Sequence, residues 1–257
     1  KGAGELVLAV KHLEYAAHMP QVKRSCALIY AVNPFGADHQ SHEHDPAYGA
    51  YPKKMAQFGL LNPLPDTAMN GEKVRFALYM QHVYSITDTL NLCQFVWGPA
   101  WQLYDCNQMV EMVRAVSGWD VNLFELMKAG ERRLNMLRAY NAREGIGREA
   151  DTLPPKMSIP LKGGPSAGLF VPTDEFEQAK NSVMTLVDII EHVAVTPGAS
   201  GYVTMNIRTS HPNFTRNAGT VMVTVDGMTV INGKTGALNI GGGRYVGVGA
   251  GLEKLVG

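Results

Sequence analysis

The spacing of hydrophobic residues divides the chain into two regions that meet near residue 195. Up to about residue 194, apolar residues recur at helical intervals, with Pro-rich connectors between the runs. Beyond Pro197-Gly198 the pattern changes to period two, which is typical of strands. We therefore expect a mainly α bundle over 1–194, followed by a small β-rich segment over 195–257.

Turn and capping signals bound the expected helices. Val22–Val32 reads as a buried helix that stops at the turn sequence Asn33-Pro34-Phe35-Gly36. A second helix is expected over 72–86, and two more begin at the capping boxes Asp105/Gln108 and Asn122/Glu125. Expected inward positions are Met109, Met112, Val113, Val116, Leu126, Leu134, Leu137 and Tyr140, and expected outward positions are Glu131, Arg132, Arg133 and Arg138.

The last expected helix starts at Thr173 or Asp174 and carries apolar residues as far as Val193. After it, β-forming residues cluster at Tyr202–Ile207, Val221–Val225 and Thr229–Ile231. Asp226-Gly227 predicts a hairpin turn between the last two strands, and Asn232-Gly233 predicts a second turn.

Composition narrows the possible functions. The 257 residues contain 23 basic and 23 acidic side chains, a balance that favours neither nucleic acid nor an anionic membrane as partner. The sequence has no run of the roughly 18 apolar residues that span a bilayer. The chain has three cysteines, Cys26, Cys93 and Cys106. A sparse, odd number of cysteines argues against a disulfide scaffold. We therefore expect a cytoplasmic protein in a reducing compartment.

The polar loop from Asp38 to Asp45 is the first candidate for chemistry, because it contains His39, His42 and His44. His42 and His44 face the same way in an extended loop and could share a divalent metal, although the spacing matches no standard zinc signature. Two other interpretations remain open. The loop is either simply solvated, or it holds one histidine that transfers protons beside a cofactor bound elsewhere.

A second candidate follows the helix over 72–86, where the sequence reads Asp88-Thr89-Leu90-Asn91-Leu92-Cys93. A carboxylate at a helix end can accept hydrogen bonds from the amino groups of a ligand, and a cysteine thiolate is a good ligand for cluster iron. From these residues alone, Asp88 is equally well explained as a helix cap and Cys93 as a core residue.

Several blocks together resemble the tungsten-containing aldehyde ferredoxin oxidoreductase family. They occur in the family's order between about residues 10 and 182: HMPQVKRSCALIYAVNPFGADHQSHEHDP, TDTLNLCQF, MVRAVSGWDVNLFELMKAGERRLNMLRAYNAREGIGREADTLPPKM and VPTDEFEQAKNS. The resemblance covers the C-terminal domains of the family. It implies the helical bundle of those domains as the fold.

The resemblance assigns roles to the second candidate. Asp88 matches a family residue that recognises the amino groups of a pterin, and Cys93 matches a cysteine ligand of an adjacent [4Fe-4S] cluster. The backbone of Leu92 becomes a further pterin contact. Asn91 stands where the family has Gly, and Asn is the next best residue at positive φ, so we expect the turn to persist. Cys26 and Cys106 match no family ligand and are expected to be structural.

The resemblance also selects His39 as a catalytic residue that hydrogen-bonds the substrate carbonyl and helps to move protons. It places His42, His44 and Asp45 behind it or at the surface. The implied activity is oxidation of aldehydes to carboxylic acids at a tungsten, or less often molybdenum, bis-pterin. Electrons then pass through the [4Fe-4S] cluster to ferredoxin, as in an anaerobic electron-transfer enzyme.

Parts of the family pattern are not found in these residues. The family's CxxCxxxC run, its N-terminal β domain and its second pterin motif have no counterpart. The chain is therefore expected to need those N-terminal domains or a complementary subunit, and a homo-oligomer is compatible with the sequence. The alternative is a non-catalytic helical remnant fused to a β-rich binding or assembly module.

Overall fold

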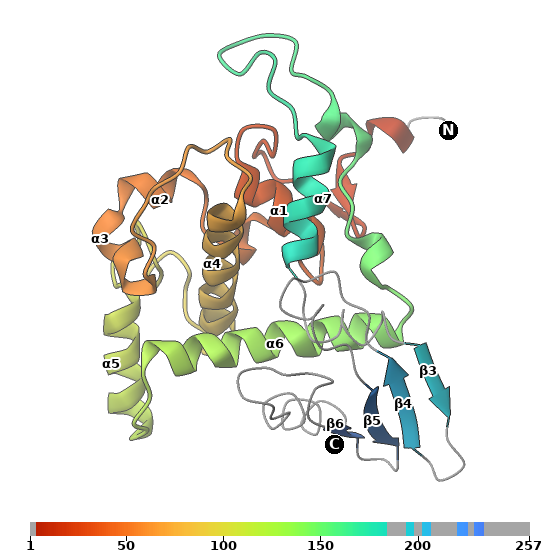
Figure 1. Ribbon diagram of the computed structural model, residues 1–257. Helices are drawn as coiled ribbons and strands as arrows, with labels where there is room; N and C mark the ends of the chain where they lie inside the picture. The colour runs from red at the N-terminus through yellow and green to blue at the C-terminus, as the bar shows by residue number, and fades with distance from the viewer. Residues whose placement is uncertain (1–3, 184–193, 198–201, 207–219, 226–228, 234–257) are drawn as a thin grey trace. The chain divides into compact units, whose positions relative to one another are not determined.

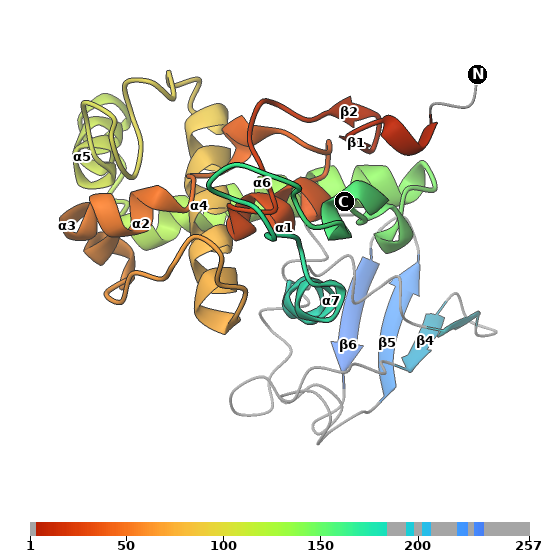
Figure 2. The same ribbon diagram turned by 90° about the horizontal axis from the view of Figure 1, so that it is seen from above.

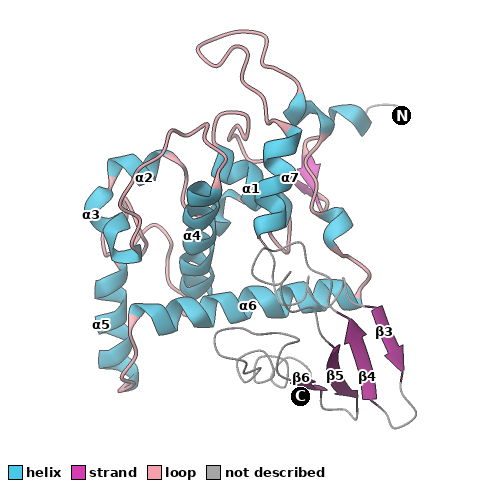
Figure 3. Cartoon of the chain, viewed as in Figure 1, coloured by secondary structure: helices cyan, strands magenta, loops and turns pink. Residues whose placement is uncertain are grey.

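Helices dominate the computed structural model, which describes residues 4–183, 194–197, 202–206, 220–225 and 229–233 (Figure 1, Figure 3). The chain divides into two compact units, Lys1–Val183 and Met184–Gly257. The expectation of a mainly helical protein with a smaller strand-forming part is confirmed. The separate domains over 1–194 and 195–257 stay a prediction, because residues 184–193 lie outside the described part.

The first unit contains the longer helices and a short ribbon. Its helices are α1 (Arg24–Val32), α2 (Pro46–Ala50), α3 (Pro52–Met55), α4 (Gly71–Thr89), α5 (Cys106–Ser117), α6 (Leu123–Arg143) and α7 (Thr173–Ser182). Short 3-10 turns are η1 (Gly4–Leu6), η2 (His39–Ser41), η3 (Ala56–Phe58), η4 (Arg148–Ala150) and η5 (Pro155–Ser158). Strands β1 (Ala9–Val10) and β2 (Leu13–Glu14) pair antiparallel.

Helix α4 occupies the centre of the first unit. It contacts α1, α6, α7 and η2, and Figures 1 and 2 show α6 running across its lower end. The crossing is close because α6 has a glycine at the contact. A Cβ on Gly130 would lie 2.2 Å from the backbone oxygen of His82 in α4. The Ser85 hydroxyl completes the contact by donating to the Gly130 oxygen at 2.9 Å.

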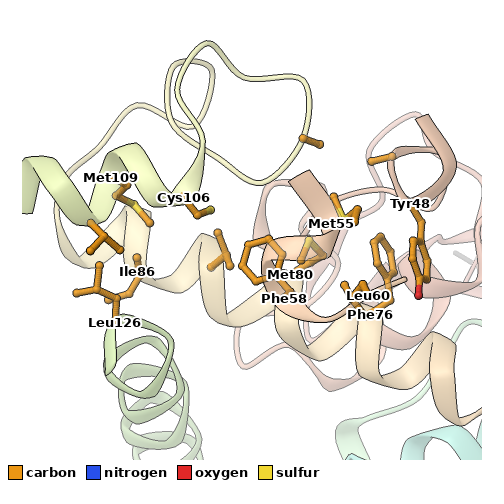
Figure 4. Packing of buried hydrophobic residues seen from close by; sticks show 14 of the residues in the cluster. Tyr48, Met55, Phe58, Leu60, Phe76, Met80, Ile86, Cys106, Met109 and Leu126 are labelled. Atoms are coloured by element: carbon orange, nitrogen blue, oxygen red, sulfur yellow. The ribbon is translucent and has the colours of Figure 1, made fainter. Parts of the chain in front are cut away.

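The largest hydrophobic cluster lies between α4 and the surrounding helices (Figure 4). Its labelled members are Tyr48, Met55, Phe58, Leu60, Phe76, Met80, Ile86, Cys106, Met109 and Leu126. Cys106 belongs to this cluster and Cys26 is fully buried in α1, so the expectation that both are structural fits their positions. Burial raises the pKa of both thiols, which makes them poor nucleophiles and ligands.

A buried ion pair joins three segments of the first unit. Lys73 of α4 contacts the Asp45 carboxylate, and both side chains are fully buried. The Ser25 amide, at the start of α1, donates to both carboxylate oxygens of Asp45 at 3.1 and 3.0 Å. Asp45 was expected behind His39 or at the surface, and its complete burial corrects the surface alternative. A carboxylate is stable there because each oxygen has a donor.

The predicted starts at the two capping boxes are confirmed, whereas two other predicted helix bounds are wrong. The helix expected over Val22–Val32 begins at Arg24, and the helix expected over 72–86 continues to Thr89, so Asp88 lies in its last turn and not after it. All of α1 is buried, and α5 and α6 both begin with complete capping boxes, at Asp105/Gln108 and Asn122/Glu125. Helix α7 begins at Thr173 as predicted, but its expected continuation beyond Val183 lies outside the described residues.

Three predicted side-chain directions are wrong. Val116 is 84% exposed because it lies in the last turn of α5, and Tyr140 of α6 is 63% exposed. Arg138 was expected to face outward but is buried, because it pairs with the buried Asp151 at 2.8 Å. Helical periodicity shows which residues share a face, whereas a buried counter-ion decides whether an arginine can enter the core.

The second unit contains a four-stranded antiparallel sheet in the order β3-β4-β5-β6. The strands are β3 (Ala194–Pro197), β4 (Tyr202–Asn206), β5 (Thr220–Val225) and β6 (Thr229–Gly233). Val225 pairs with Thr229, as the hairpin predicted around Asp226-Gly227 requires. Asn232 pairs with Met222 within the ladder, so the second predicted turn is wrong.

None of the helices in the described residues combines the length and apolar character that crossing a membrane would demand.

Replacing Gly130 by Ala should lower the free energy of unfolding by about 2 kcal/mol, since the new methyl group meets a backbone oxygen that cannot move aside. Urea unfolding followed by circular dichroism measures the change. The matched control is Gly71→Ala, where a Cβ meets open space and the effect should stay below about 0.5 kcal/mol. Equal unfolding midpoints for Gly130→Ala and the wild type would contradict the close crossing.

Candidate functional site

Asp88 lies in the last turn of α4, and Cys93 lies four residues beyond the end of the helix, on the loop that follows. The backbone amide of Asn91 donates to the backbone carbonyl oxygen of Asp88 at 3.2 Å. The backbone amide of Leu92 donates to the backbone carbonyl oxygen of Thr87 at 2.8 Å. These two bonds form a Schellman ending, which needs a residue in the left-handed conformation. Asn91 occupies that position with φ of 54°, so the predicted turn with Asn in place of Gly is present.

The Asp88 carboxylate is partly open to solvent and has two side-chain neighbours. Nε2 of Gln94 donates to its Oδ1 at 3.0 Å, and Nη1 of Arg133 lies 3.2 Å from its Oδ2. Partial burial raises the pKa of the Asp88 carboxyl, while Arg133 and Gln94 act to lower it and Asp38 raises it further. The carboxylate is therefore held in place but remains accessible to a ligand.

Leu92 and Cys93 differ in what they offer to a ligand. The Leu92 amide is occupied by the bond to Thr87, so any backbone contact from Leu92 must use its carbonyl oxygen. Its side chain packs against the main hydrophobic cluster. Cys93 is a free, exposed thiol, in contrast to the buried Cys26 and Cys106. Cys93 is therefore accessible to iron.

Arg133 is the residue at this site that the sequence analysis assigned no role. It was expected on the outward face of α6, and its side chain is indeed about one-third exposed, but it points to Asp88. Its Nη1 also lies 3.4 Å from the Ser85 hydroxyl, one turn before Asp88 on α4. The only signal in the sequence was its spacing of three residues from Gly130, the glycine at the helix crossing.

His39 lies in η2, which contacts α4. The side chain of the preceding residue, Asp38, caps η2 by accepting from the Gln40 amide at 2.9 Å. Asp38 also acts electrostatically on Asp88, so the loop of His39 is in the same neighbourhood as the end of α4. His39 itself is one-third exposed, and its Nε2 accepts from Nε2 of Gln40 at 2.9 Å.

His39 belongs to a group of aromatic rings that includes His18, which the sequence analysis did not single out. The ring centroid of His18 lies 4.9 Å from that of His39 and 4.3 Å from that of His44. Burial, reinforced by the nearby Lys23, lowers the pKa of His44 to about 4, and burial also lowers the pKa of His18. Both rings are largely neutral near pH 7.

His42 is completely buried, which corrects the alternative of a surface position. Neither of its ring nitrogens has a hydrogen-bond partner among the described residues. Burial lowers its pKa well below the ordinary value, and the neighbouring His44, His39, His18 and Lys23 add to this effect. His42 is therefore neutral, with an unsatisfied ring N–H in the interior.

A buried carboxyl, Glu43, lies beside these histidines. The Tyr84 hydroxyl donates to its Oε2 at 2.9 Å, and the side-chain amide of Gln102 donates to the same oxygen at 3.4 Å. The backbone amide of His44 donates to its Oε1 at 2.9 Å. Burial raises the pKa of Glu43, and these hydrogen bonds oppose the rise. The network fixes the loop against α4.

The described residues contain no group of three or more His, Cys, Asp and Glu side chains arranged to hold a metal ion. The rings of His42 and His44, which were considered as a shared metal site, have their centroids 5.5 Å apart. The interpretation in which one accessible histidine transfers protons is more compatible with the geometry.

Comparisons with known proteins agree with the block order in the sequence. Residues 1–187 match the family described as aldehyde ferredoxin oxidoreductase, domains 2 and 3. Over 171 residues the chain is 29% identical to the tungsten-containing aldehyde ferredoxin oxidoreductase of Thermococcus kodakarensis and 28% identical to that of Pyrococcus furiosus. These alignments cover 65% of the chain and 26% of each relative. The chain thus spans about a quarter of the length of these relatives.

The pKa of His42 predicts a specific pH dependence of stability. A histidine kept neutral in the folded state takes up its proton on unfolding, so its contribution to stability is present above pH 6.5 and is lost as the pH falls below it. His42→Leu should therefore show a smaller loss of unfolding free energy than the wild type between pH 7.5 and 5. Urea unfolding at both pH values measures the difference. Between pH 7.5 and 8.5 the two proteins should change in parallel, and identical slopes down to pH 5 would contradict the prediction.

Proposed function

The chain belongs to the aldehyde ferredoxin oxidoreductase family, and from this premise we propose that it forms one wall of a tungsten-pterin site that oxidises aldehydes to carboxylic acids. The observation that carries the proposal is the end of α4 with the loop after it, which present an accessible carboxylate, Asp88, and an accessible thiol, Cys93, five residues apart in the chain.

The donor set fits part of the implied cofactors. The Asp88 carboxylate is of the right type for the amino groups of a pterin, and the Leu92 carbonyl offers a further acceptor beside it. Cys93 supplies one of the four thiolates that a [4Fe-4S] cluster requires. Cys26 and Cys106 are buried, so three ligands and the second pterin contact have to come from further domains or a complementary subunit.

When bound, the tungsten bis-pterin would supply the two-electron redox chemistry. The role left to the described residues is to bind, orient and transfer protons. Among the histidines of the ring group, we assign to His39 the role of hydrogen-bonding the substrate carbonyl. His39 is partly exposed, whereas His42 is buried and His44 is occupied by contacts to Lys23 and the His39 oxygen. A donor at the aldehyde oxygen would stabilise the charge that develops there.

Ferredoxin is the electron acceptor that the family name implies, and we propose it as the partner of the assembled enzyme. We favour tungsten over molybdenum because the relatives are named as tungsten-containing. The exposed Cys93 would be protected from oxidation in a reducing, anaerobic cytoplasm, which is the location that we propose.

Metal analysis of the anaerobically purified, intact protein tests the proposal. We expect tungsten and iron, with iron strongly reduced in Cys93→Ser and tungsten strongly reduced in Asp88→Asn, because each change removes one cofactor contact. Asp120→Asn, a change at a fully exposed carboxylate, is the control and should retain both metals. Absence of tungsten, molybdenum and iron from the wild type would contradict the function and favour a non-catalytic binding or assembly role.

The role of His39 predicts a kinetic effect without loss of cofactor. His39→Gln in the holoenzyme should lower kcat for ferredoxin-linked aldehyde oxidation by about 100-fold, since a positioned acid–base group contributes at least that much. Tungsten content should not change. His12→Asn, at an exposed histidine with positive φ that Asn tolerates, is the matched control. An unchanged kcat in His39→Gln would remove His39 from the mechanism.

A further inference from the structure

The Asp88 carboxylate has a hydrogen-bond donor on each side. Nε2 of Gln94 is 3.0 Å from Oδ1, and Nη1 of Arg133 is 3.2 Å from Oδ2. The three side chains come from the end of α4, from the loop after it and from α6. Asp88 is 35% exposed and Arg133 is 32% exposed, so a flat ligand that reaches the carboxylate also meets the guanidinium.

This arrangement has a definite hydrogen-bonding order along its edge: donor from Gln94, two acceptors from Asp88, donor from Arg133. A carboxylate has about four lone-pair sites, so each oxygen can keep its present donor and accept a further N–H from a ligand. The complementary ligand edge must therefore read acceptor, donor, donor, acceptor.

A 2-amino-4-oxopyrimidine edge has this order. Its ring N1 accepts, its 2-amino group and N3–H donate, and its 4-oxo oxygen accepts. We propose that Gln94 and Arg133 are specificity-determining residues that act with Asp88 to select this edge, with Arg133 facing the 4-oxo group and Gln94 facing N1. The proposal rests on the assignment of Asp88 to pterin recognition under the proposed function, and it adds which heterocycles are rejected.

Two analogues isolate the two halves of this edge. A 2,4-dioxopteridine replaces the 2-amino donor by an oxygen that faces the Asp88 carboxylate, and its N1 carries a hydrogen that faces the Gln94 donor. A 2,4-diaminopteridine replaces the 4-oxo acceptor by an amino group that faces Arg133, donor against donor, and its N3 has no hydrogen to donate to Asp88. Each mismatch removes a hydrogen bond to a charged group, which weakens binding by about tenfold or more. Guanosine has the same edge as a pterin on a smaller ring system, so it tests whether pterin or guanine is the ligand.

The experiment is a fluorescence titration of the full chain at pH 7 with pterin, both analogues and guanosine. We expect the wild type to prefer pterin over each analogue by about tenfold or more. In Arg133→Gln the preference over the 2,4-diamino analogue should become smaller, because the Gln amide can present its oxygen to the 4-amino group while N3 still has no hydrogen for Asp88. The 2,4-dioxo analogue should still be rejected. Gln94→Leu should weaken pterin binding, and Asp88→Asn should reduce the preference over the 2,4-dioxo analogue, whose N1–H still meets Gln94.

Arg132→Gln, at the exposed neighbouring position on α6, is the matched control and should leave every affinity unchanged. Arg133→Lys retains the charge and should keep part of the preference at position 4. Circular dichroism of each variant confirms that it folds.

The unfavourable outcomes are distinguishable. If Arg133→Gln weakens all pteridines equally, or if the wild type binds them without preference, the proposed specificity is overturned while pterin recognition by Asp88 stands. If the wild type binds no pteridine, or if Asp88→Asn binds pterin as the wild type does, the assignment of Asp88 and the proposal both fail. Tighter binding of guanosine than of pterin would support selection of this edge and overturn the pterin function.

Discussion

The close crossing of α4 and α6 at Gly130 is the constraint on which the candidate site depends. The absence of a side chain lets the two backbones approach until only a hydrogen would fit between Gly130 and the His82 oxygen. Arg133 lies three residues beyond Gly130 on α6, and Asp88 lies six residues beyond His82 on α4. The short distance between the helices is therefore what brings a guanidinium from α6 within reach of a carboxylate at the end of α4. A wider crossing would leave Asp88 with neighbours from its own loop.

Buried polar groups fix the histidine loop against the same helix. Asp45 is held by Lys73 of α4 and by the Ser25 amide near the start of α1, and Glu43 is held by Tyr84 of α4. Charges at such positions are stable only when each has partners, so the loop has few alternative positions. Because both anchors involve α4, the segment that carries His39 is placed beside the helix that ends in Asp88. Apolar packing alone would allow the loop to slide.

Local signals predicted the capped starts of α5 and α6 accurately and the direction of long side chains less well. Both capping boxes and the turn at Asn91 were readable, since they depend on residues three to five positions apart. Tyr140 and Arg138 were each assigned to the wrong side of α6, because an exposed aromatic and a buried arginine are decided by what lies opposite. For Arg138 that neighbour is Asp151, thirteen residues farther along the chain. Neither position carries a signal in its own helix.

The sequence by itself determined the family, most of the helices and the five-residue spacing of Asp88 and Cys93, because these depend on residue order and on short-range hydrogen bonds. It also indicated a histidine-rich loop, from which the resemblance selected His39. Only the tertiary structure decided that His42 is buried, that His18 joins His39 and His44, and that Arg133 and Gln94 flank Asp88. Those relations join residues from different helices and loops. Their distances are set by how closely the backbones pack, which residue spacing along one element does not encode.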